Sequence, residues 1–228
     1  MMIQNASQDF IGRDAFVFFR SILAFAHSKG DLLLKQDNRK IASDLIESTI
    51  KVIARDGFDK ASTRNIAKEC GIADAYIYLH FEDKDDLFAK TFQKEDTALA
   101  EEVKKHLSIL DQQGITNEDK IYFLFNKVWM HLIAYPDSCR FYVQYYYSPY
   151  YQKYSAQEHA SLWMPIAERV KVLFRPETDV KAALRLVLNT MIGQAIKATA
   201  NTSADQDSIA QSNYELILGM VQNCLLDE

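Results

Sequence analysis

The residues with the clearest chemical role lie between Thr63 and Lys84, in the run TRNIAKECGIADAYIYLHFEDK. Thr63 is placed to cap a short helix that ends at Gly71, and a second helix is expected from about Ala73 to His80. Glycine takes a positive φ without strain, so a short turn at this point lets two helices meet at a steep angle. Such a pair can lay its second helix in the major groove of double-stranded DNA.

The outward face of the second helix carries the groups that would touch DNA. Small residues at its start let the backbone approach base edges, and tyrosine and histidine side chains can donate hydrogen bonds to phosphates or bases. Lys84 would begin the next helix behind the cap Asp83, where its charge and the free N–H groups both favour a phosphate oxygen. The predicted DNA-binding residues are Thr63, Arg64, Ala73, Asp74, Ala75, Tyr76, Tyr78, His80 and Lys84.

A third helix is expected upstream, over residues 39–55, because its apolar residues form a broad stripe at helical spacing. Gly57 ends this helix, and Phe58 is expected to fold back onto the core. Phe81 is interpreted as a core aromatic. Tyr78 fits the core and a DNA contact equally well, and His80 and Lys84 could also be plain surface residues.

The whole stretch from Arg39 to Phe88 resembles the N-terminal domain of TetR-family repressors. Those proteins are dimeric, all-helical and usually ligand-responsive. The resemblance implies phosphate contacts from Thr63, Tyr78 and Lys84, and groove contacts from the segment 73–76. The matching residues are Gly57-Phe58, Thr63, Ile66-Ala67, Gly71-Ile72, Tyr78, His80-Phe81 and Lys84 followed by Asp86-Leu87-Phe88.

Two residues of the second helix depart from the family pattern. The family commonly has Ser or Thr where Ala73 stands, so this helix lacks a side-chain cap, a loss of about 1 kcal/mol. Asp74 occupies a position that is often basic. It would repel phosphate unless it accepts a hydrogen bond from a cytosine amino group.

Composition favours a helical protein without a broad nucleic-acid coat. The 228 residues include only 7 glycines and 4 prolines, and the net charge is −5. Residues 38–84 hold equal numbers of basic and acidic side chains, eight of each. DNA binding would then rest on a few placed contacts and on doubling in a dimer. Cys70, Cys139 and Cys224 are odd in number and far apart, which predicts neither disulfides nor a zinc site and fits the cytoplasm.

The predicted architecture is all-α, with an N-terminal three-helix helix-turn-helix domain over 38–84 and a larger helical regulatory and dimerisation domain over 85–228. The N-terminal domain over 38–84 is called the reading unit below. Six helices are expected after it, at about 84–110, 118–135, 137–147, 156–174, 179–200 and 206–226. Residues 1–37 are treated as an extension. A wrongly assigned start is the favoured interpretation of this extension, ahead of an added amphipathic helix and of a signal segment, and no membrane span is expected.

The last two predicted helices carry apolar stripes wider than one surface helix needs. The resemblance implies a four-helix interface in a homodimer, and ordinary packing within one chain is the alternative. The predicted interface residues are Leu184, Val187, Leu188, Met191, Ile192, Leu216, Ile217 and Met220.

Aromatic residues are dense between Phe141 and Trp163, and together with residues of neighbouring helices they could line a mostly apolar cavity. Simple packing explains any one of them at least as well. The predicted ligand-binding residues are Trp129, Met130, Phe141, Tyr145, Trp163, Met164, Met191 and Gln194.

The leading prediction is a TetR-like DNA-binding transcriptional regulator, a repressor that a small-molecule effector releases from a near-palindromic operator. The alternative is a coactivator or adaptor of the same fold that acts through a protein partner without reading DNA. An enzyme is disfavoured, because the histidines show no metal-ligand spacing and neither a phosphate loop nor a nucleophile motif is evident. No catalytic residue, metal or cofactor is predicted.

Overall fold

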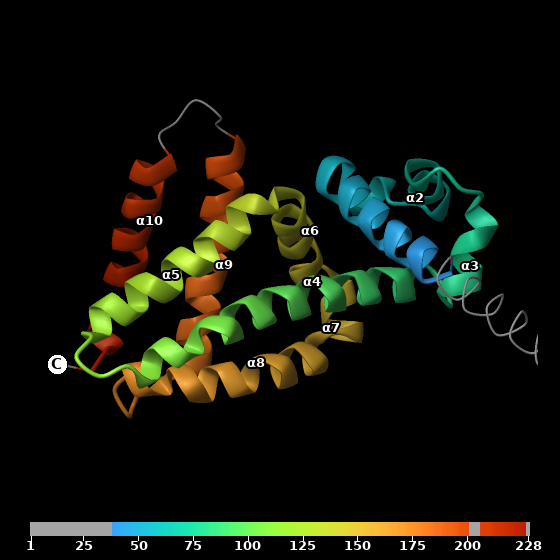
Figure 1. Cartoon of the computed structure of the whole chain (residues 1–228). Coiled ribbons are helices and arrows are strands. Elements are labelled where there is room, and N and C mark those ends of the chain that lie inside the picture. Colours follow the sequence, from blue (N-terminus) through green and yellow to red (C-terminus); the bar gives the residue numbers. More distant parts are fainter. Residues whose placement is uncertain (1–37, 201–205, 227–228) are drawn as a thin grey trace, which may run out of the picture. The chain divides into compact units, whose positions relative to one another are not determined.

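The computed structural model describes residues 38–200 and 206–226 (Figure 1). Within these residues the chain is helical, and the only strand-like pairing is a single antiparallel bridge between Phe174 and Leu225. The all-α prediction is confirmed. The expectations for residues 1–37 lie outside the described residues. No described helix is both long and apolar enough to span a membrane.

The chain divides into two compact units, residues 1–44 and 45–228, and the helix over residues 38–56 crosses the division. The second unit contains every element that follows. The reading unit continues with a 3-10 turn at Phe58–Lys60, α2 at Thr63–Cys70, a 3-10 turn at Asp74–Tyr76 and α3 at Ile77–His80. The helix predicted over 39–55 is therefore present, one residue longer at each end.

Helix α2 begins one residue earlier than the sequence predicts, because Ser62 and not Thr63 is its N-cap. The Ser62 hydroxyl accepts a hydrogen bond from the Asn65 backbone N–H at 3.2 Å, which satisfies one of the free amides of the first turn. Gly71 closes the helix in the left-handed region, at φ 76°, as expected of a helix-ending glycine.

The second helix of the pair is split. A 3-10 turn over Asp74–Tyr76 leads into the single α-helical turn of α3, where one continuous helix over 73–80 is predicted. Ala73 provides no side-chain cap, and the first turn instead tightens so that the Tyr76 N–H donates to the Ala73 carbonyl at 3.0 Å. Missing capping chemistry thus changes the geometry of this element.

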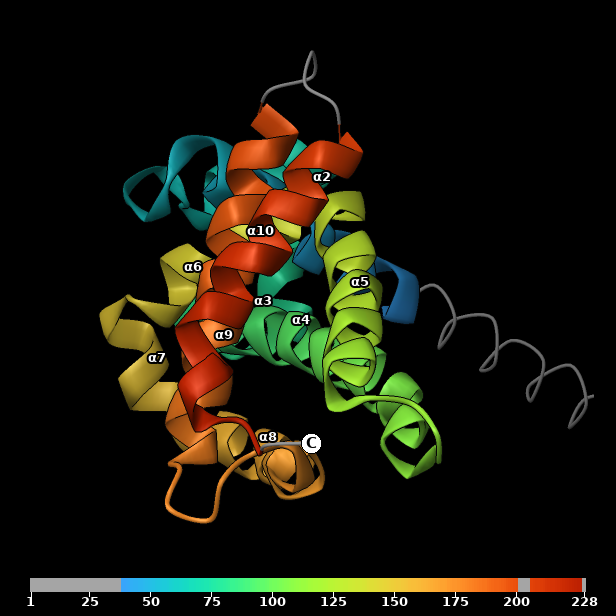
Figure 2. The ribbon, with the colours of Figure 1, turned by 90° about the vertical axis from the view of Figure 1, so that its left-hand side faces the viewer.

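Helix α4, Lys84–His106, is the longest in the described chain, and Asp83 caps it by accepting from the Asp86 N–H at 2.8 Å. A 3-10 turn at Leu107–Asp111 follows. The buried stripe of α4 packs against α5, α6, α7 and α8 (Figures 1 and 2). Because it starts at the reading unit and ends among the C-terminal helices, α4 belongs to both regions.

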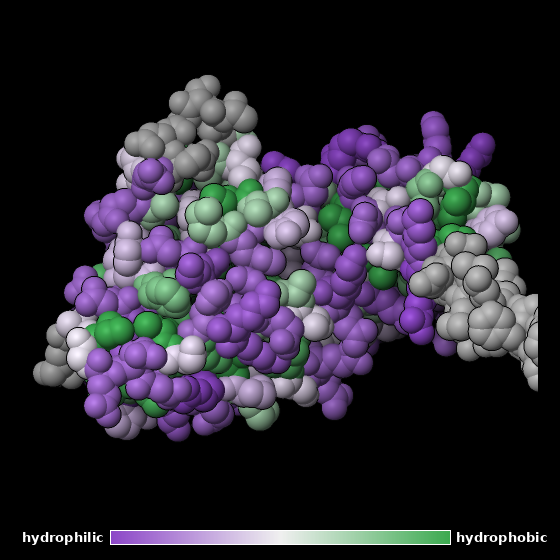
Figure 3. All heavy atoms as spheres, viewed as in Figure 1, coloured by the Kyte–Doolittle hydropathy of each residue, from purple (hydrophilic) through white to green (hydrophobic). Residues whose placement is uncertain are grey.

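The remaining elements are α5 at Asn117–Ala134, α6 at Pro136–Tyr146, α7 at Pro149–Tyr154, α8 at Ala156–Val170, α9 at Val180–Ala200 and α10 at Gln206–Val221. Short 3-10 turns follow α8 and α10. Helix α9 contacts α5, α6, α8 and α10 and is the centre of this group (Figure 2). Polar residues cover most of the face in Figure 3, and apolar residues gather there in small patches.

Helix α7 is an element that the sequence analysis did not predict. Pro149 lies in its first turn, where a missing N–H costs nothing and a fixed φ favours the helix. Tyr151 is the buried residue of this short helix. The tyrosine-rich stretch is therefore structured core, at least in part.

Replacing Ser62 by alanine should lower the free energy of unfolding by about 1 kcal/mol, because the Asn65 amide loses its partner. Thr63→Ala should change it by less than about 0.5 kcal/mol, since Thr63 lies inside the helix and makes no cap. Urea titrations of both variants followed by circular dichroism provide the measurement. Equal losses would contradict the assignment of the cap.

Candidate nucleic-acid interface and ligand cavities

The segment from Ala73 to His80, called the reading element below, presents a solvent-exposed face of small and aromatic residues. Ala73, Asp74 and Ala75 are exposed at its start, Tyr78 is 59% exposed and Leu79 is 74% exposed. Tyr76 is also exposed. Side chains of this size on a single short element leave an apolar surface that a partner could cover.

Two side chains hold this element on the core beneath it. Ile77 is fully buried, and Phe81 is buried, as the sequence analysis predicted.

The exposure of Tyr78 excludes the core alternative for that residue. His80 is half-buried, and its Nε2 is enclosed without a hydrogen-bond partner among the described residues. A DNA contact through Nε2 would therefore need a rotation of the side chain.

Lys84 forms no ion pair with the three acidic residues nearest to it in the first turn of α4, and each of the three has another partner. Asp83 caps α4, Asp86 pairs with Lys90 at 2.7 Å, and Asp85 accepts from the Tyr154 hydroxyl at 2.9 Å. The Lys84 ammonium lies 5.5 Å from the centroid of the Phe88 ring and has no ion pair within the described chain. Its ammonium group is therefore available at a helix N-terminus, where the free N–H groups also favour a phosphate oxygen.

Thr63 and Arg64 begin α2, the first partly exposed and the second exposed. Together with Lys84 and the exposed face of the reading element, all nine predicted DNA-binding residues lie in the described helix-turn-helix region. Their roles in binding remain predictions.

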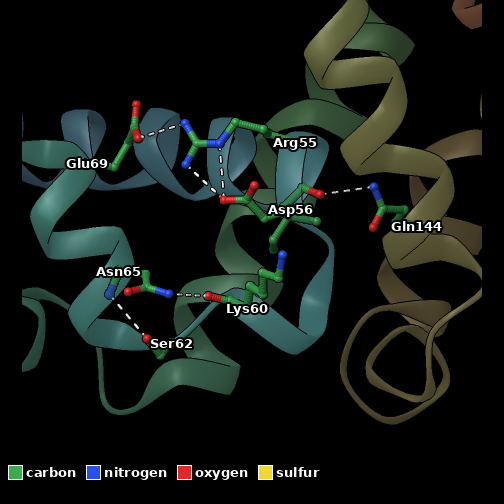
Figure 4. A network of polar contacts seen from close by, with 8 residues as sticks. Arg55, Asp56, Lys60, Ser62, Asn65, Glu69 and Gln144 are labelled. Carbon is green, nitrogen blue, oxygen red and sulfur yellow. Dashed lines mark hydrogen bonds and ion pairs between the residues drawn. The ribbon is translucent and has the colours of Figure 1, made fainter.

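A set of polar contacts holds the reading unit together (Figure 4). Arg55, near the end of the helix over 38–56, pairs with Asp56 at 2.9 Å and with Glu69 of α2 at 3.1 Å. Hydrogen bonding to this guanidinium lowers the pKa of the Asp56 carboxyl, although both side chains remain accessible to water. The Asn65 amide donates to the Lys60 carbonyl at 2.8 Å. These contacts orient α2, and no sequence spacing pointed to them.

One further contact joins this unit to α6. The Gln144 side-chain amide donates to the backbone carbonyl of Ile53 at 3.0 Å (Figure 4). The sequence analysis missed Gln144, because a lone glutamine in a tyrosine-rich stretch carries no signal of its partner 91 residues away.

An apolar cavity of about 110 Å³ lies among α4, α5, α9 and α10 and the segment after α8. Aliphatic residues dominate its wall, and the aromatic residues Phe125, Phe174 and Tyr214 complete it. It has room for several water-sized groups, yet it offers them few hydrogen-bond partners, so it favours an apolar occupant. Its lining includes Val103, Phe125, Val128, Val170, Leu173, Leu184, Val187, Leu188, Met191 and Ile217.

The structure does not bring the eight predicted ligand-binding residues into one cavity. Met191 lines the apolar cavity, whereas Trp163 and Met164 line a second cavity of about 230 Å³. Met130 is 62% exposed, and Gln194 is half-buried. The other three, Trp129, Phe141 and Tyr145, are packed in the core.

Tyr145 was predicted to line the ligand cavity, and its contacts explain why it is packed in the core instead. Its ring stacks on Phe92 at a centroid distance of 4.6 Å, and its hydroxyl makes a hydrogen bond to Ser155 at 2.9 Å. Burial raises the pKa of the Tyr145 hydroxyl. Both ends of the side chain are satisfied internally, so none of it is left for a ligand.

The predicted dimer residues separate into buried and accessible groups. Met191, Ile192 and Ile217 are buried inside the single chain, and Leu184, Val187 and Leu188 are half-buried. All of these except Ile192 line the apolar cavity. Only Leu216 and Met220 are exposed. Leu186 is 49% exposed and was not predicted, because it falls outside the stripe that the periodicity suggested.

Asp96 of α4 is the most constrained polar residue of the C-terminal helices. The residue is 2% exposed, and its carboxylate accepts from Tyr142 Oη at 2.9 Å and from Trp163 Nε1 at 2.7 Å. His159 Nδ1 lies 2.9 Å from its second oxygen. Burial, then the charge of Asp96, raises the pKa of the Tyr142 hydroxyl well above its usual value. A carboxylate only accepts hydrogen bonds, so all three partners donate.

Asp96→Ala should lower the free energy of unfolding by about 3 kcal/mol, because the buried Tyr142 hydroxyl and Trp163 N–H lose their acceptor. Asp111→Asn, which removes an exposed pairing with Arg169, should change it by less than about 0.5 kcal/mol. Calorimetric unfolding of both variants tests this. A loss at Asp96 no larger than at Asp111 would refute the network.

Residues 45–91 match the family model described as bacterial regulatory proteins, tetR family. Among curated proteins, the fatty acid metabolism regulator protein of Bacillus subtilis is 26% identical over 83 residues, a match that covers 36% of this chain and 41% of that protein. This chain therefore spans less than half of that relative's length.

No metal-binding group of His, Cys, Asp or Glu forms in the described ranges.

Two solved structures have a similar fold. A tetR family transcription regulator from Shewanella sp. PV-4 has a TM-score of 0.66 at 17% identity and covers 82% of this chain and 99% of its own. The transcriptional regulator FadR from Bacillus subtilis, solved in complex with stearoyl-CoA, has a TM-score of 0.59 at 20% identity, with coverage of 77% and 96%. At these identities the similarity establishes the fold.

Proposed function

We propose that this chain is a repressor of transcription that an effector releases from DNA. Support comes from the match of residues 45–91 to the family model of tetR regulatory proteins and from the fold that the chain shares with a tetR family regulator. The observation that carries the proposal is the exposed face of the reading element. Tyr76, Tyr78 and Leu79 are large side chains held outward by buried Ile77, and a DNA groove is the surface that would cover them.

The proposed complex is a dimer on a near-palindromic operator. Two reading elements would enter successive major grooves about 34–36 Å apart. The exposed leucines Leu186 of α9 and Leu216 of α10, with Met220, form the proposed dimer surface. Doubling the contacts compensates for a reading unit in which acidic and basic residues are balanced.

Phosphate contacts in this complex come from Thr63, Tyr78 and Lys84. The ammonium of Lys84 supports this assignment, since Asp83, Asp85 and Asp86 each have another partner and Lys84 forms no ion pair within the described chain. A phosphate contact positions the protein without reading sequence.

Lys84→Ala should weaken binding to operator and to scrambled DNA by the same factor, and it should reduce the slope of log K against log[salt] by about 1. Fluorescence anisotropy over a salt series measures both quantities. A loss confined to the operator would contradict the phosphate role. Lys197→Ala, at an exposed lysine of α9, is the matched control.

The proposed effector carries a long acyl chain, which would enter the apolar cavity. Support comes from the nearly non-polar wall of that cavity, and from the curated relative and the solved structure whose names refer to fatty acids and stearoyl-CoA. Each buried methylene would contribute about 0.8 kcal/mol. Val103 of α4 is part of the wall, so a chain in the cavity would press on the same helix that begins at Lys84.

A side chain that fills the apolar cavity should impair the release of DNA by the effector without changing DNA binding itself. Val128→Phe places a ring in the space meant for the chain, so stearoyl-CoA should release operator DNA at least tenfold less effectively while DNA affinity without effector stays the same. Met130→Phe, at an exposed position of the same helix, should behave like the unaltered protein. Anisotropy with DNA from just upstream of the protein's own gene measures release.

The adaptor alternative is favoured by one observation. Asp74 is exposed at the start of the reading element, where its charge would face phosphates. Absence of any preference for upstream over scrambled DNA at every salt concentration would support an adaptor and overturn the repressor. Equal release of the Val128→Phe protein by stearoyl-CoA would instead remove the acyl effector and leave DNA reading in place.

A further inference from the structure

The second cavity, of about 230 Å³, lies among α6, α7, α8 and α9. Two residues of α9, Leu184 and Leu188, line this cavity and the apolar cavity, so their side chains form the partition between the two. The walls on the two sides of the partition differ in chemistry. The apolar cavity is mainly aliphatic, whereas this one is aromatic and basic.

Aromatic rings form three neighbouring sides of the second cavity. The centroids of Tyr146 and Tyr151 lie 4.4 Å apart, and those of Tyr146 and His159 lie 5.7 Å apart. The ring of His159 in turn lies 6.0 Å from that of Trp163. Rings in such an arrangement expose π faces and edges to the enclosed space, which suits a flat aromatic guest.

The α9 side of the cavity is positively charged. Lys181 and Arg185 are exposed, one helical turn apart, and neither forms an ion pair within the described chain. No Asp or Glu is among the residues that line the cavity. Burial raises the pKa of the Tyr151 hydroxyl, which keeps this wall residue neutral beside the two cations.

His159 contributes a ring nitrogen that is held in a fixed orientation. Its Nδ1 is committed to Asp96 at 2.9 Å, and no hydrogen bond occupies its Nε2 among the described residues. The Asp96 carboxylate is itself occupied by Tyr142 and Trp163. The carboxylate thus orients the histidine from behind without lining the cavity, and Nε2 is left for a ligand.

We propose that this cavity is a second ligand site, separate from the acyl cavity, that binds a flat aromatic monoanion such as an arylcarboxylate. The ring of the ligand lies between Tyr146 and Trp163, and its carboxylate faces Arg185 and Lys181. A guanidinium can hold a carboxylate through two parallel hydrogen bonds, which makes Arg185 the main contact. The second site extends the proposed function, because a regulator with two cavities can respond to two classes of compound.

The test measures binding of 4-nitrobenzoate to the full-length protein by isothermal titration calorimetry, with 4-nitrobenzamide as the uncharged ligand of the same shape. Binding of the carboxylate is expected, and the amide should bind at least about tenfold more weakly. Arg185→Gln should weaken carboxylate binding by about tenfold or more. Arg185 is exposed and unpaired in the described chain, so its replacement should leave the fold intact.

Two controls make the outcome decisive. Lys197→Gln removes another exposed cation of α9, one that lines neither cavity, and should leave the affinity unchanged. Saturation with 1-dodecanol, an uncharged chain suited to the apolar cavity, should not displace 4-nitrobenzoate. The proposal fails if no carboxylate binding is measured, if the amide binds equally well, if the two variants lose affinity alike, or if dodecanol competes.

Discussion

The buried carboxylate of Asp96 is the constraint on which the arrangement of the C-terminal helices depends. Removing a carboxylate from water costs several kcal/mol unless hydrogen bonds replace the lost hydration. Its donors come from α6 and α8, so the charge on α4 is tolerated only when both helices keep their register against it. The same bonds position His159 and Trp163 in the wall of the aromatic cavity. A polar network thus fixes both a fold and a site.

Aromatic packing continues from this network to the reading unit. Phe92 lies against Tyr142 and stacks on Tyr145, while Phe58 lies against Phe88 and Tyr145. Close-packed rings shift together and do not deform singly. A change in the position of α4 at the cavities would therefore be transmitted to the segment that follows the first helix. This continuity is a physical route for coupling, and measured coupling energies would establish its use.

Helical periodicity predicted most elements of this chain, because apolar spacing depends only on local geometry. It placed α5, α9 and the helix over 38–56 to within a residue or two. The cap was misplaced by one residue, since Ser62 and Thr63 have similar capping chemistry and only the backbone angle distinguishes them. The network of Asp96 was not predictable in this way. Its partners lie 46, 63 and 67 residues away, where spacing carries no information.

Chain length decides whether an acyl effector can perform the proposed switch. Emptying an operator that is 99% occupied, to about 1%, requires a preference of about 10⁴ for the released conformation, or roughly 5.5 kcal/mol. At about 0.8 kcal/mol for each methylene buried in one conformation only, about seven methylenes are needed. Short acyl chains fall below this limit and long ones exceed it. Under the proposed function, a cavity with an aliphatic wall would therefore select acyl effectors by length as well as by polarity.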